Sequence, residues 1–427
     1  MKHATSAALA ATLAATPLMA QNPIDTIRPD APALAPYGDF PVGVQERSFT
    51  VPGRVDIVNV TETATPTYDR SYTVEIWYPA APGTQAGGTY ETVIRDGQTA
   101  TTLTGRAARD ATPAEGRFPL VVISHGYPGN RFLMSHLGEN LASKGYVTVS
   151  IDHADSTYSD QAAFGSTLYN RPWDQKAVID HMAGLDGPLG AIADTDTTGV
   201  IGYSMGGYGA LIFGGAGVTQ QAVDYSWGTP RGLLAANQAG TDAHAGLMDA
   251  RVKAIIAIGP WGKNMNFWDE TGLAGLRKPT LMMAGSVDDV SVYPAMRQIF
   301  EQATGTDRHL LTFIGANHNA AAPIPAPAEA WEDTGVLDFM PFDHYADAVW
   351  DNVRMNNIAQ HFATGFMNLH LKGDSNMARY FDLVEYAEEG KVSRNDAGEE
   401  KDDHNYWAGF APRTAAGLRF ETLNKGE

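Results

Sequence analysis

The segment Gly202-Tyr203-Ser204-Met205-Gly206-Gly207 has the pattern Gly-x-Ser-x-Gly and separates two apolar runs of different character. Residues 199–201 before it are apolar and partly β-branched, whereas residues 208–213 after it suit a buried helix. We therefore expect a strand, a sharp turn and a helix, with Ser204 at the turn as a nucleophile and the glycines allowing close approach of the flanking segments. The alternative is a glycine-rich loop in an ordinary α/β protein, so other parts of the chain must decide.

The chain on either side of this segment alternates strand and helix patterns. Residues 118–126 contain an apolar run typical of a strand buried on both faces, and a helical pattern and a second strand follow it, which together predict a βαβ unit. Further strands are expected at 44–51, 71–78, 254–258, 280–283 and 309–314, and further helices at 173–182, 293–303 and 343–371. This alternation predicts an α/β fold with a mostly parallel central sheet flanked by helices on both faces.

The 427 residues divide into four expected parts. These are a signal peptide (1–20), an extended Pro- and Ala-rich leader (21–43), the α/β domain (44–372) and an acidic C-terminal extension (373–427), with insertions in the domain at about 215–250 and 320–342. Long irregular insertions of this kind are commonly lids or binding loops. The acidic cluster between Glu385 and Asp403 is interpreted as a solvated loop, with a divalent-cation site as the alternative.

The N-terminus predicts export. Lys2 precedes a short apolar stretch, and small residues follow up to Ala20, where we expect cleavage, so that the mature protein is periplasmic or secreted. The alternatives are a disordered Ala-rich tail and a membrane anchor, but the apolar stretch is too short to span a bilayer. The sequence contains no cysteine, which excludes disulfides, a Cys-linked lipid anchor and a thiol nucleophile.

The net charge of the chain limits the classes of partner that it can bind. Lys and Arg number 30 against 49 Asp and Glu, for a net charge of −19. Such a surface repels nucleic acid and anionic membranes, so neither is expected as a partner. The oligomeric state is left open by the sequence.

A base and an acid for Ser204 are expected downstream. A serine hydroxyl needs a base to accept its proton and an acid to orient that base. Asp288 follows the strand pattern that ends at Gly285, and His318 follows the next one, so both should lie at the same edge of the sheet as Ser204. The order Ser204, Asp288, His318 is the order of a hydrolase triad. Asp289 is the alternative acid, and Asp288 would then only cap the helix that follows it. For His318 the alternative is that it has no chemical role, since the chain contains twelve histidines.

Acyl transfer also needs donors for an oxyanion. The backbone N–H of Met205, at the start of the helix after the nucleophile, is one expected donor. The other is the N–H of Tyr127, in the loop after residues 118–126. His125 in this loop is expected to brace it and not to act as a second base.

Residues 118–318 resemble α/β-hydrolases of the branch that contains bacterial cutinases and polyester hydrolases, platelet-activating-factor acetylhydrolases and dienelactone hydrolases. The match to cutinases is the most detailed: Gly126-Tyr127 is similar to their oxyanion turn, residues 202–207 to their Gly-His-Ser-Met-Gly-Gly elbow, and residues 315–318 to their Gly-Ala-Ser-His turn. Pro260-Trp261 is similar to their Pro-Trp substrate wall. The resemblance implies that Trp261, together with Tyr127, lines the substrate pocket; the alternative for Trp261 is a core aromatic at a strand end.

The chain also departs from these families. Tyr203 stands where cutinases usually carry His, and the chain is much longer than a typical lidless cutinase and lacks its disulfide. The insertion after His318 is well placed to cover the site, which argues against an open polymer-binding groove. Acetylhydrolases of this branch can take their acid one strand earlier, where residues 258–261 offer no carboxylate, and dienelactone hydrolases use a cysteine.

The sequence therefore predicts an exported serine hydrolase of carboxylic esters that needs no metal or organic cofactor. Small or medium soluble esters rank first as substrates, followed by aromatic polyesters and phospholipid-like esters. A non-catalytic binding protein on a hydrolase scaffold is the alternative of another class, and a peptidase or other amide hydrolase is a third.

Overall fold

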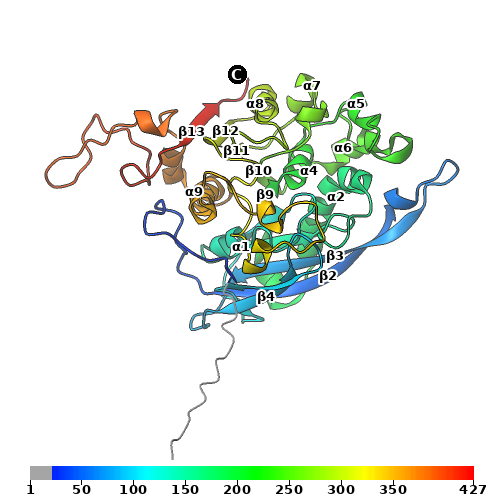
Figure 1. Cartoon of the computed structure of the whole chain (residues 1–427), viewed down its shortest axis with the longest axis horizontal. Helices are drawn as coiled ribbons and strands as arrows, with labels where there is room; N and C mark the ends of the chain where they lie inside the picture. Colours follow the sequence, from blue (N-terminus) through cyan, green and yellow to red (C-terminus); the bar gives the residue numbers. More distant parts are fainter. Residues whose placement is uncertain (1–21) are drawn as a thin grey trace, which may run out of the picture.

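The computed structural model describes residues 22–427, and the expected signal peptide lies outside this range. A ten-stranded sheet in the order β13-β12-β11-β10-β9-β7-β8-β3-β2-β6 runs through the molecule (Figure 1). Its six central strands, β12 to β8, pair in parallel, whereas β13, β3 and β2 join by antiparallel pairing. The predicted α/β class with a mostly parallel sheet is confirmed. Its strands are β2 (Val42–Val55), β3 (Thr67–Pro79), β6 (Ala108–Arg109), β7 (Phe118–Ser124), β8 (Val147–Asp152), β9 (Ala193–Tyr203), β10 (Val252–Ile258), β11 (Thr280–Gly285), β12 (Arg308–Phe313) and β13 (Leu418–Leu423).

Helices cover both faces of the sheet because the central strands are apolar on both sides. Helices α1 and α9 pack with one set of strand residues, and α2, α4 and α8 pack with the alternate set, giving three layers (Figure 1). The helices are α1 (Ser135–Ala142), α2 (Phe164–Ala183), α3 (Gly187–Ile192), α4 (Met205–Phe213), α5 (Gln220–Val223), α6 (Asp242–Leu247), α7 (Glu270–Leu273), α8 (Tyr293–Gln302) and α9 (Asn352–Leu371). Among residues 22–427, every helix is too short or too polar to traverse a bilayer.

The helix expected at 343–371 begins later than predicted. Helix α9 starts at Asn352, because the side chain of Asp351 accepts a hydrogen bond from the amide of Arg354 and caps the first turn. Residues Pro341–His344 form a separate 3-10 turn. The segment between His318 and α9 therefore crosses the edge of the sheet at which the parallel strands end.

The two ends of the described chain both join the fold. Asn22–Pro23 (β1) pairs with β5 (Ala100–Gly105), which pairs with β4 (Gly88–Val93) in a small second sheet. At the other end, β13 forms the outer strand of the large sheet, although it lies beyond residue 372, where the sequence placed the end of the α/β domain. The extension also contributes Phe381, Trp407, Phe410 and Phe420 to the core.

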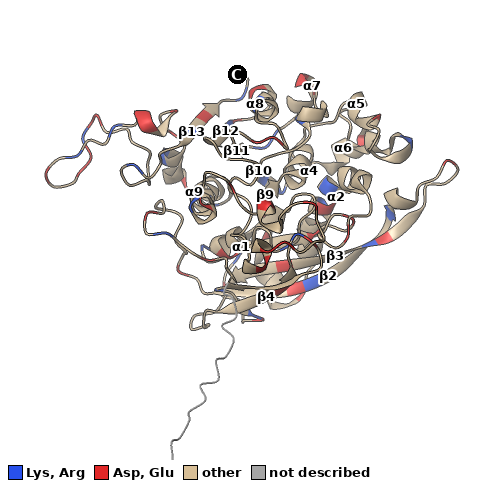
Figure 2. Ribbon diagram, viewed as in Figure 1, with Lys and Arg blue, Asp and Glu red and all other residues tan. Residues whose placement is uncertain are grey.

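Acidic and basic residues are interspersed along the chain (Figure 2). In the acidic cluster of the extension, Asp403 pairs with Lys391 and Glu385 pairs with Arg419. Within residues 22–427, no group of three or more acidic or histidine side chains is arranged to hold a metal ion.

Candidate active site

Ser204 lies at the tight turn between β9 and α4. Its backbone has φ 53° and ψ −112°, a conformation that non-glycine residues rarely adopt and that is typical of a nucleophile elbow. The amide of Ser204 donates to the carbonyl of Ile258 on β10 (2.8 Å), and its carbonyl accepts from the amide of Tyr208 in α4 (2.9 Å). The strained turn is thus held from the neighbouring strand and from the following helix.

Glycines around Ser204 allow this turn to pack. A side chain at Gly202 would collide with the backbone of Gly206, and one at Gly206 would collide with the carbonyl of Ser124 on β7. At Gly207 a Cβ would lie 3.1 Å from Pro260, a tight contact. Residues 202–207 therefore need their small residues for close packing between strand, turn and helix, as the sequence predicted.

The structure brings Ser204, His318 and Asp288 together in one hydrogen-bonded chain. Nε2 of His318 lies 3.0 Å from Oγ of Ser204, and Nδ1 of His318 lies 2.7 Å from Oδ2 of Asp288. Asp288 follows β11 and His318 follows β12, so parallel strands deliver all three residues to the same edge of the sheet. With Nδ1–H donated to the carboxylate, Nε2 is the nitrogen that can accept the serine proton.

Two local features distinguish Asp288 from Asp289. The second oxygen of Asp288 accepts hydrogen bonds from the amides of Val290 (2.9 Å) and Ser291 (2.8 Å), and the residue is buried. Asp289 is exposed at the rim of the adjoining cavity and forms no ion pair with another described residue. The arrangement places Asp288 behind the imidazole, although its contact with the Val290 and Ser291 amides also resembles a cap.

The turn after β7 lies beside Ser204. A Cβ at Gly126 would lie 3.2 Å from Cβ of Ser204, so this loop and Ser204 are in close contact. The backbone amides of Tyr127 and Met205 donate no hydrogen bond to another residue within 22–427. Both amides are therefore available as donors, and Met205 is at the N-terminus of α4, where helix amides lack internal partners.

A cavity of about 300 Å³ opens next to Ser204. Its walls combine residues from the turn after β7, the elbow, the loop after β11, and the segment after His318. The lining residues are Arg95, Gly126, Tyr127, Pro128, Tyr203, Ser204, Asp289, Val290, Asn317, His318, Asn319, Phe339, Asp343 and His344.

The insertion after His318 forms part of this cavity and is held by several hydrogen bonds. Nε2 of buried His136 donates to the carbonyl of Ala322 (2.9 Å), and the amide of Ile324 donates to the carbonyl of Leu133 (2.9 Å). The side chain of Asn319 donates to the carbonyls of Asp343 (2.8 Å) and Ala346 (2.7 Å). Phe339 of residues 320–342 thus lines the cavity, whereas none of residues 215–250 does.

Trp261 lies next to the site but does not line the cavity. Its amide donates to the carbonyl of Ser204 (3.3 Å), while its ring packs edge-on against Phe164 and Phe267. Tyr127 does line the cavity, and its ring also contacts Phe164. The position of Trp261 in this aromatic cluster favours the core interpretation that the sequence left open.

Several lining residues were not expected from the sequence. The Tyr203 hydroxyl donates to Oδ1 of Asn319 (3.2 Å) and its ring lies 5.1 Å from that of His318, so it joins the elbow to the segment after His318. His344 shares a hydrogen bond with Tyr158 (2.9 Å), and burial together with nearby Arg95 and His318 lowers the pKa of His344 to about 3. A neutral His344 adds no charge beside His318. Of these residues, only Tyr203 lies in a motif that could have identified it from the sequence, the Gly-x-Ser-x-Gly segment.

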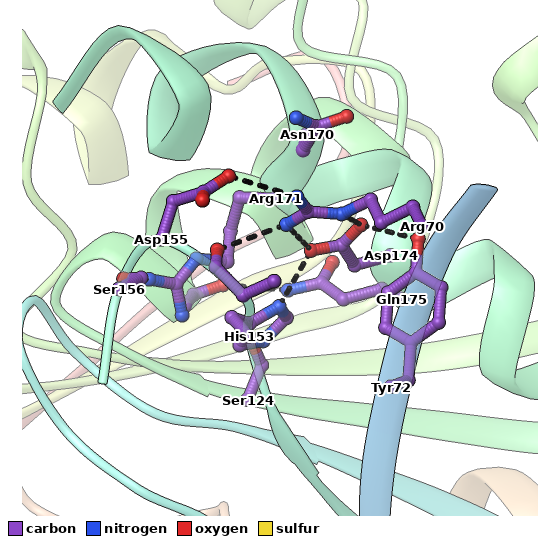
Figure 3. Close-up of polar contacts among 12 residues, drawn as sticks. Arg70, Tyr72, Ser124, His153, Asp155, Ser156, Asn170, Arg171, Asp174 and Gln175 are labelled. Carbon is purple, nitrogen blue, oxygen red and sulfur yellow. Dashed lines mark hydrogen bonds and ion pairs between the residues drawn. The ribbon is translucent and has the colours of Figure 1, made fainter. Parts of the chain in front are cut away.

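A second Ser-His-Asp chain lies beneath the site. Oγ of Ser124 is 2.8 Å from Nε2 of His153, whose Nδ1 is 2.9 Å from Oδ2 of Asp174, and Arg70 donates to both oxygens of Asp174 (Figure 3). Burial and the nearby guanidinium of Arg171 lower the pKa of His153 to about 3. All three members are buried and none lines the cavity next to Ser204. This chain therefore has the hydrogen-bond order of a triad without access for a substrate.

Known proteins resemble both the fold and the sequence. The structure of a ferulic acid esterase from Streptomyces cinnamoneus matches with a TM-score of 0.55 and 21% identity, covering 81% of this chain and 94% of that one. The chain has the α/β-hydrolase fold. The family model described as PET hydrolase-like matches residues 83–224 of this chain.

Two curated relatives extend the likeness. A bis(hydroxyethyl) terephthalate hydrolase of Streptomyces coelicolor is 34% identical over 23% of this chain and 29% of its own length. Cutinase 2 of Thermobifida cellulosilytica is 26% identical over 47% of this chain and 60% of its own length. The matched segments thus span less than two thirds of either relative. The predicted resemblance to α/β-hydrolases of the cutinase and polyester-hydrolase type is confirmed.

Proposed function

We propose that the protein is a serine hydrolase of carboxylic esters. The observation that carries this proposal is the hydrogen-bonded chain from Ser204 through His318 to Asp288 at the wall of a cavity. The strained backbone of Ser204 supports it, because strain of this kind persists at catalytic turns where the surrounding structure holds it. The likeness to a bis(hydroxyethyl) terephthalate hydrolase and to cutinases supports the same reaction class.

In the proposed mechanism Oγ of Ser204 attacks the ester carbonyl carbon while Nε2 of His318 accepts the serine proton. Asp288 keeps Nδ1 protonated and stabilises the imidazolium that forms. The amides of Tyr127 and Met205 donate to the oxyanion of the tetrahedral intermediate. The intermediate collapses when His318 gives its proton to the leaving alcohol, and an acyl-enzyme remains. Water, deprotonated by His318, then releases the carboxylic acid and restores Ser204.

Small or medium soluble esters are the proposed substrates. The cavity of about 300 Å³ and the covering segment with Phe339 favour a ligand that enters a pocket over a polymer laid along an open surface. The second candidate is hydrolysis of aromatic polyesters, favoured by the names of the relatives. Hydrolysis of a short-chain nitrophenyl ester without release of products from polyester film would reject this second candidate.

We further propose that the mature protein is exported, because residues 1–20 have the three-part pattern of a signal peptide.

A fluorophosphonate probe tests the proposal directly. We expect the purified protein to be labelled at Ser204, as mapped by peptide mass spectrometry, and to hydrolyse nitrophenyl acetate. Ser204→Ala should lose both properties while keeping the circular dichroism spectrum of the parent. Labelling at another serine, or no labelling and no hydrolysis by folded protein, would contradict the proposal and favour a non-catalytic binding protein.

A further inference from the structure

The peptide that joins Gly126 to Tyr127 is anchored from the protein interior. Its carbonyl oxygen, on Gly126, accepts from Nδ1 of His125 (2.7 Å) and from Nη2 of Arg171 (3.3 Å). The preceding carbonyl, on His125, accepts from Nη1 of Arg171 (2.5 Å). One guanidinium thus spans two successive carbonyls of the turn beside Ser204.

Arg171 is an unusual residue for a protein core. It lies on α2 with 1% of its surface exposed, and within residues 22–427 it forms no ion pair. Besides the two carbonyls it donates to the hydroxyl of Ser156, while its Nε has no partner among the described residues. A buried guanidinium without a carboxylate partner is unfavourable for stability, so its directed contacts with this turn suggest a functional role.

The other donor, His125, is fixed in one neutral form. Because a carbonyl oxygen can only accept, Nδ1 of His125 carries the proton, and Nε2 accepts from the amide of His153 (3.2 Å). Burial and the nearby charge of Arg171 lower the pKa of His125 well below its ordinary value. His125 therefore keeps the donor aimed at Gly126 throughout the range in which an esterase would work.

The geometry of a peptide links these anchors to the site. The Gly126–Tyr127 peptide is trans, so its N–H points opposite to its C=O. With the carbonyl directed at Arg171 and His125, the amide of Tyr127 is directed away from them. Gly126 and Tyr127 line the cavity together with Ser204, and this amide has no other acceptor among the described residues.

We propose that Arg171 and His125 are positioning residues that aim the amide of Tyr127 at the oxyanion and increase its polarity. This inference rests on the proposed ester hydrolysis, in which that amide is an oxyanion donor. A charge-assisted hydrogen bond to the carbonyl strengthens the N–H of the same peptide as a donor. Since the oxyanion forms only during reaction, the effect belongs to the transition state and not to substrate binding.

The test compares two buried arginines. Arg171→Lys keeps the charge but cannot span both carbonyls. Arg308→Lys is the matched control, because Arg308 is equally buried and donates to backbone carbonyls such as those of Phe300 and Asn424, at the opposite ends of the strands. For each variant we would measure kcat and KM on nitrophenyl butyrate, the inhibition constant of phenylboronic acid, and Tm. Boronic acids form an anionic tetrahedral adduct with a reactive serine and so report on the oxyanion donors.

We expect Arg171→Lys to lower kcat by about 10- to 100-fold, less than the full loss of one oxyanion donor, with KM nearly unchanged. Boronate affinity should fall by a similar factor, whereas Arg308→Lys should lower Tm without changing either. His125→Asn, whose amide can replace Nδ1 as donor, should retain more activity than His125→Leu, which provides a second comparison if Arg171→Lys does not fold. Unchanged kcat and boronate affinity in Arg171→Lys, with His125→Leu no worse than His125→Asn, would overturn the inference. Because the parent protein is assayed with the fluorophosphonate probe in the same experiment, failure of the proposed function is recognised separately.

Discussion

The carboxylate of Asp288 lies 2.7 Å from Nδ1 of His318, whereas the side chain of the adjacent Asp289 is exposed and forms no hydrogen bond with that ring. The two residues are chemically identical and adjacent in sequence. Their positions differ because the chain turns after β11, so that only Asp288 is directed under the imidazole.

Asp288→Asn should therefore lower kcat by about 10³- to 10⁴-fold, because an amide neither holds the required tautomer nor stabilises the imidazolium. Asp289→Asn should change kcat by less than about threefold, since an exposed carboxylate interacts weakly with distant charges. Steady-state kinetics on a nitrophenyl ester distinguishes the two. A larger loss of kcat in Asp289→Asn would assign the acid to Asp289.

Substitution of Gly206 should disable the elbow. Gly206→Ala would press a methyl group against the carbonyl of Ser124, and we expect a loss of activity of at least about 100-fold or failure to fold. Gly246→Ala is the control, because Gly246 lies inside α6 with open space around it and should gain about 0.5–1 kcal/mol of stability. Urea denaturation and activity assays test both. An active Gly206→Ala protein would show that the turn at Ser204 can shift away from Ser124 without loss of activity.

Phe339 should contribute to substrate binding. It lines the cavity from the segment after His318, so we expect Phe339→Ala to raise KM for an aromatic ester about tenfold, a loss of ~1.4 kcal/mol, with little change in kcat. Val336→Ala is the matched control, because Val336 is an exposed residue of the same segment that does not line the cavity. Equal KM values for the parent and Phe339→Ala would mean that substrate does not contact this wall.

Acid should weaken the attachment of the segment after His318. Burial lowers the pKa of His136 to about 4, below the value of about 6.5 in an unfolded chain, so the unfolded state binds the proton first as the pH falls. The stability that neutral His136 contributes is complete above pH 6.5 and is lost between about pH 6.5 and 4. In His136→Gln the side chain can still donate to Ala322 but does not titrate. Between pH 6.5 and 4 the free energy of unfolding of this variant should therefore fall less steeply than that of the parent, the two slopes differing by ~1.4 kcal/mol per pH unit. Urea denaturation from pH 8 to 5 checks this, and parallel curves for the two proteins would contradict it.

The extension beyond residue 372 should be required for folding. Truncation after Lys372 removes β13 and five buried aromatic residues of the core, each worth about 1.5–3 kcal/mol, which together approach the stability of a typical domain. Deleting the exposed turn 395–399 instead should cost less than about 1 kcal/mol. Circular dichroism and Tm of the two proteins test the difference. A stable, active 22–372 fragment would show that the extension is a separate addition.

The sequence by itself determined the fold class, and it predicted the proposed nucleophile and the order of its partners. Apolar strands buried on both faces leave a continuous apolar pattern, and glycines are required where Ser204 turns between β9 and α4, so both features are local. Asp288 and His318 were predicted because consecutive parallel strands deliver the residues that follow them to one edge of the sheet.

Only the tertiary structure decided which atoms meet. Three features depend on contacts between segments far apart in sequence: the hydrogen bond of His318 with Asp288, the packing of Trp261 in an aromatic cluster, and the pairing of β13 with β12. The same is true of Arg171, which reaches carbonyls 45 and 46 residues earlier in the chain. Such contacts leave no periodic pattern, because burial and hydrogen bonding are satisfied between elements and not within them.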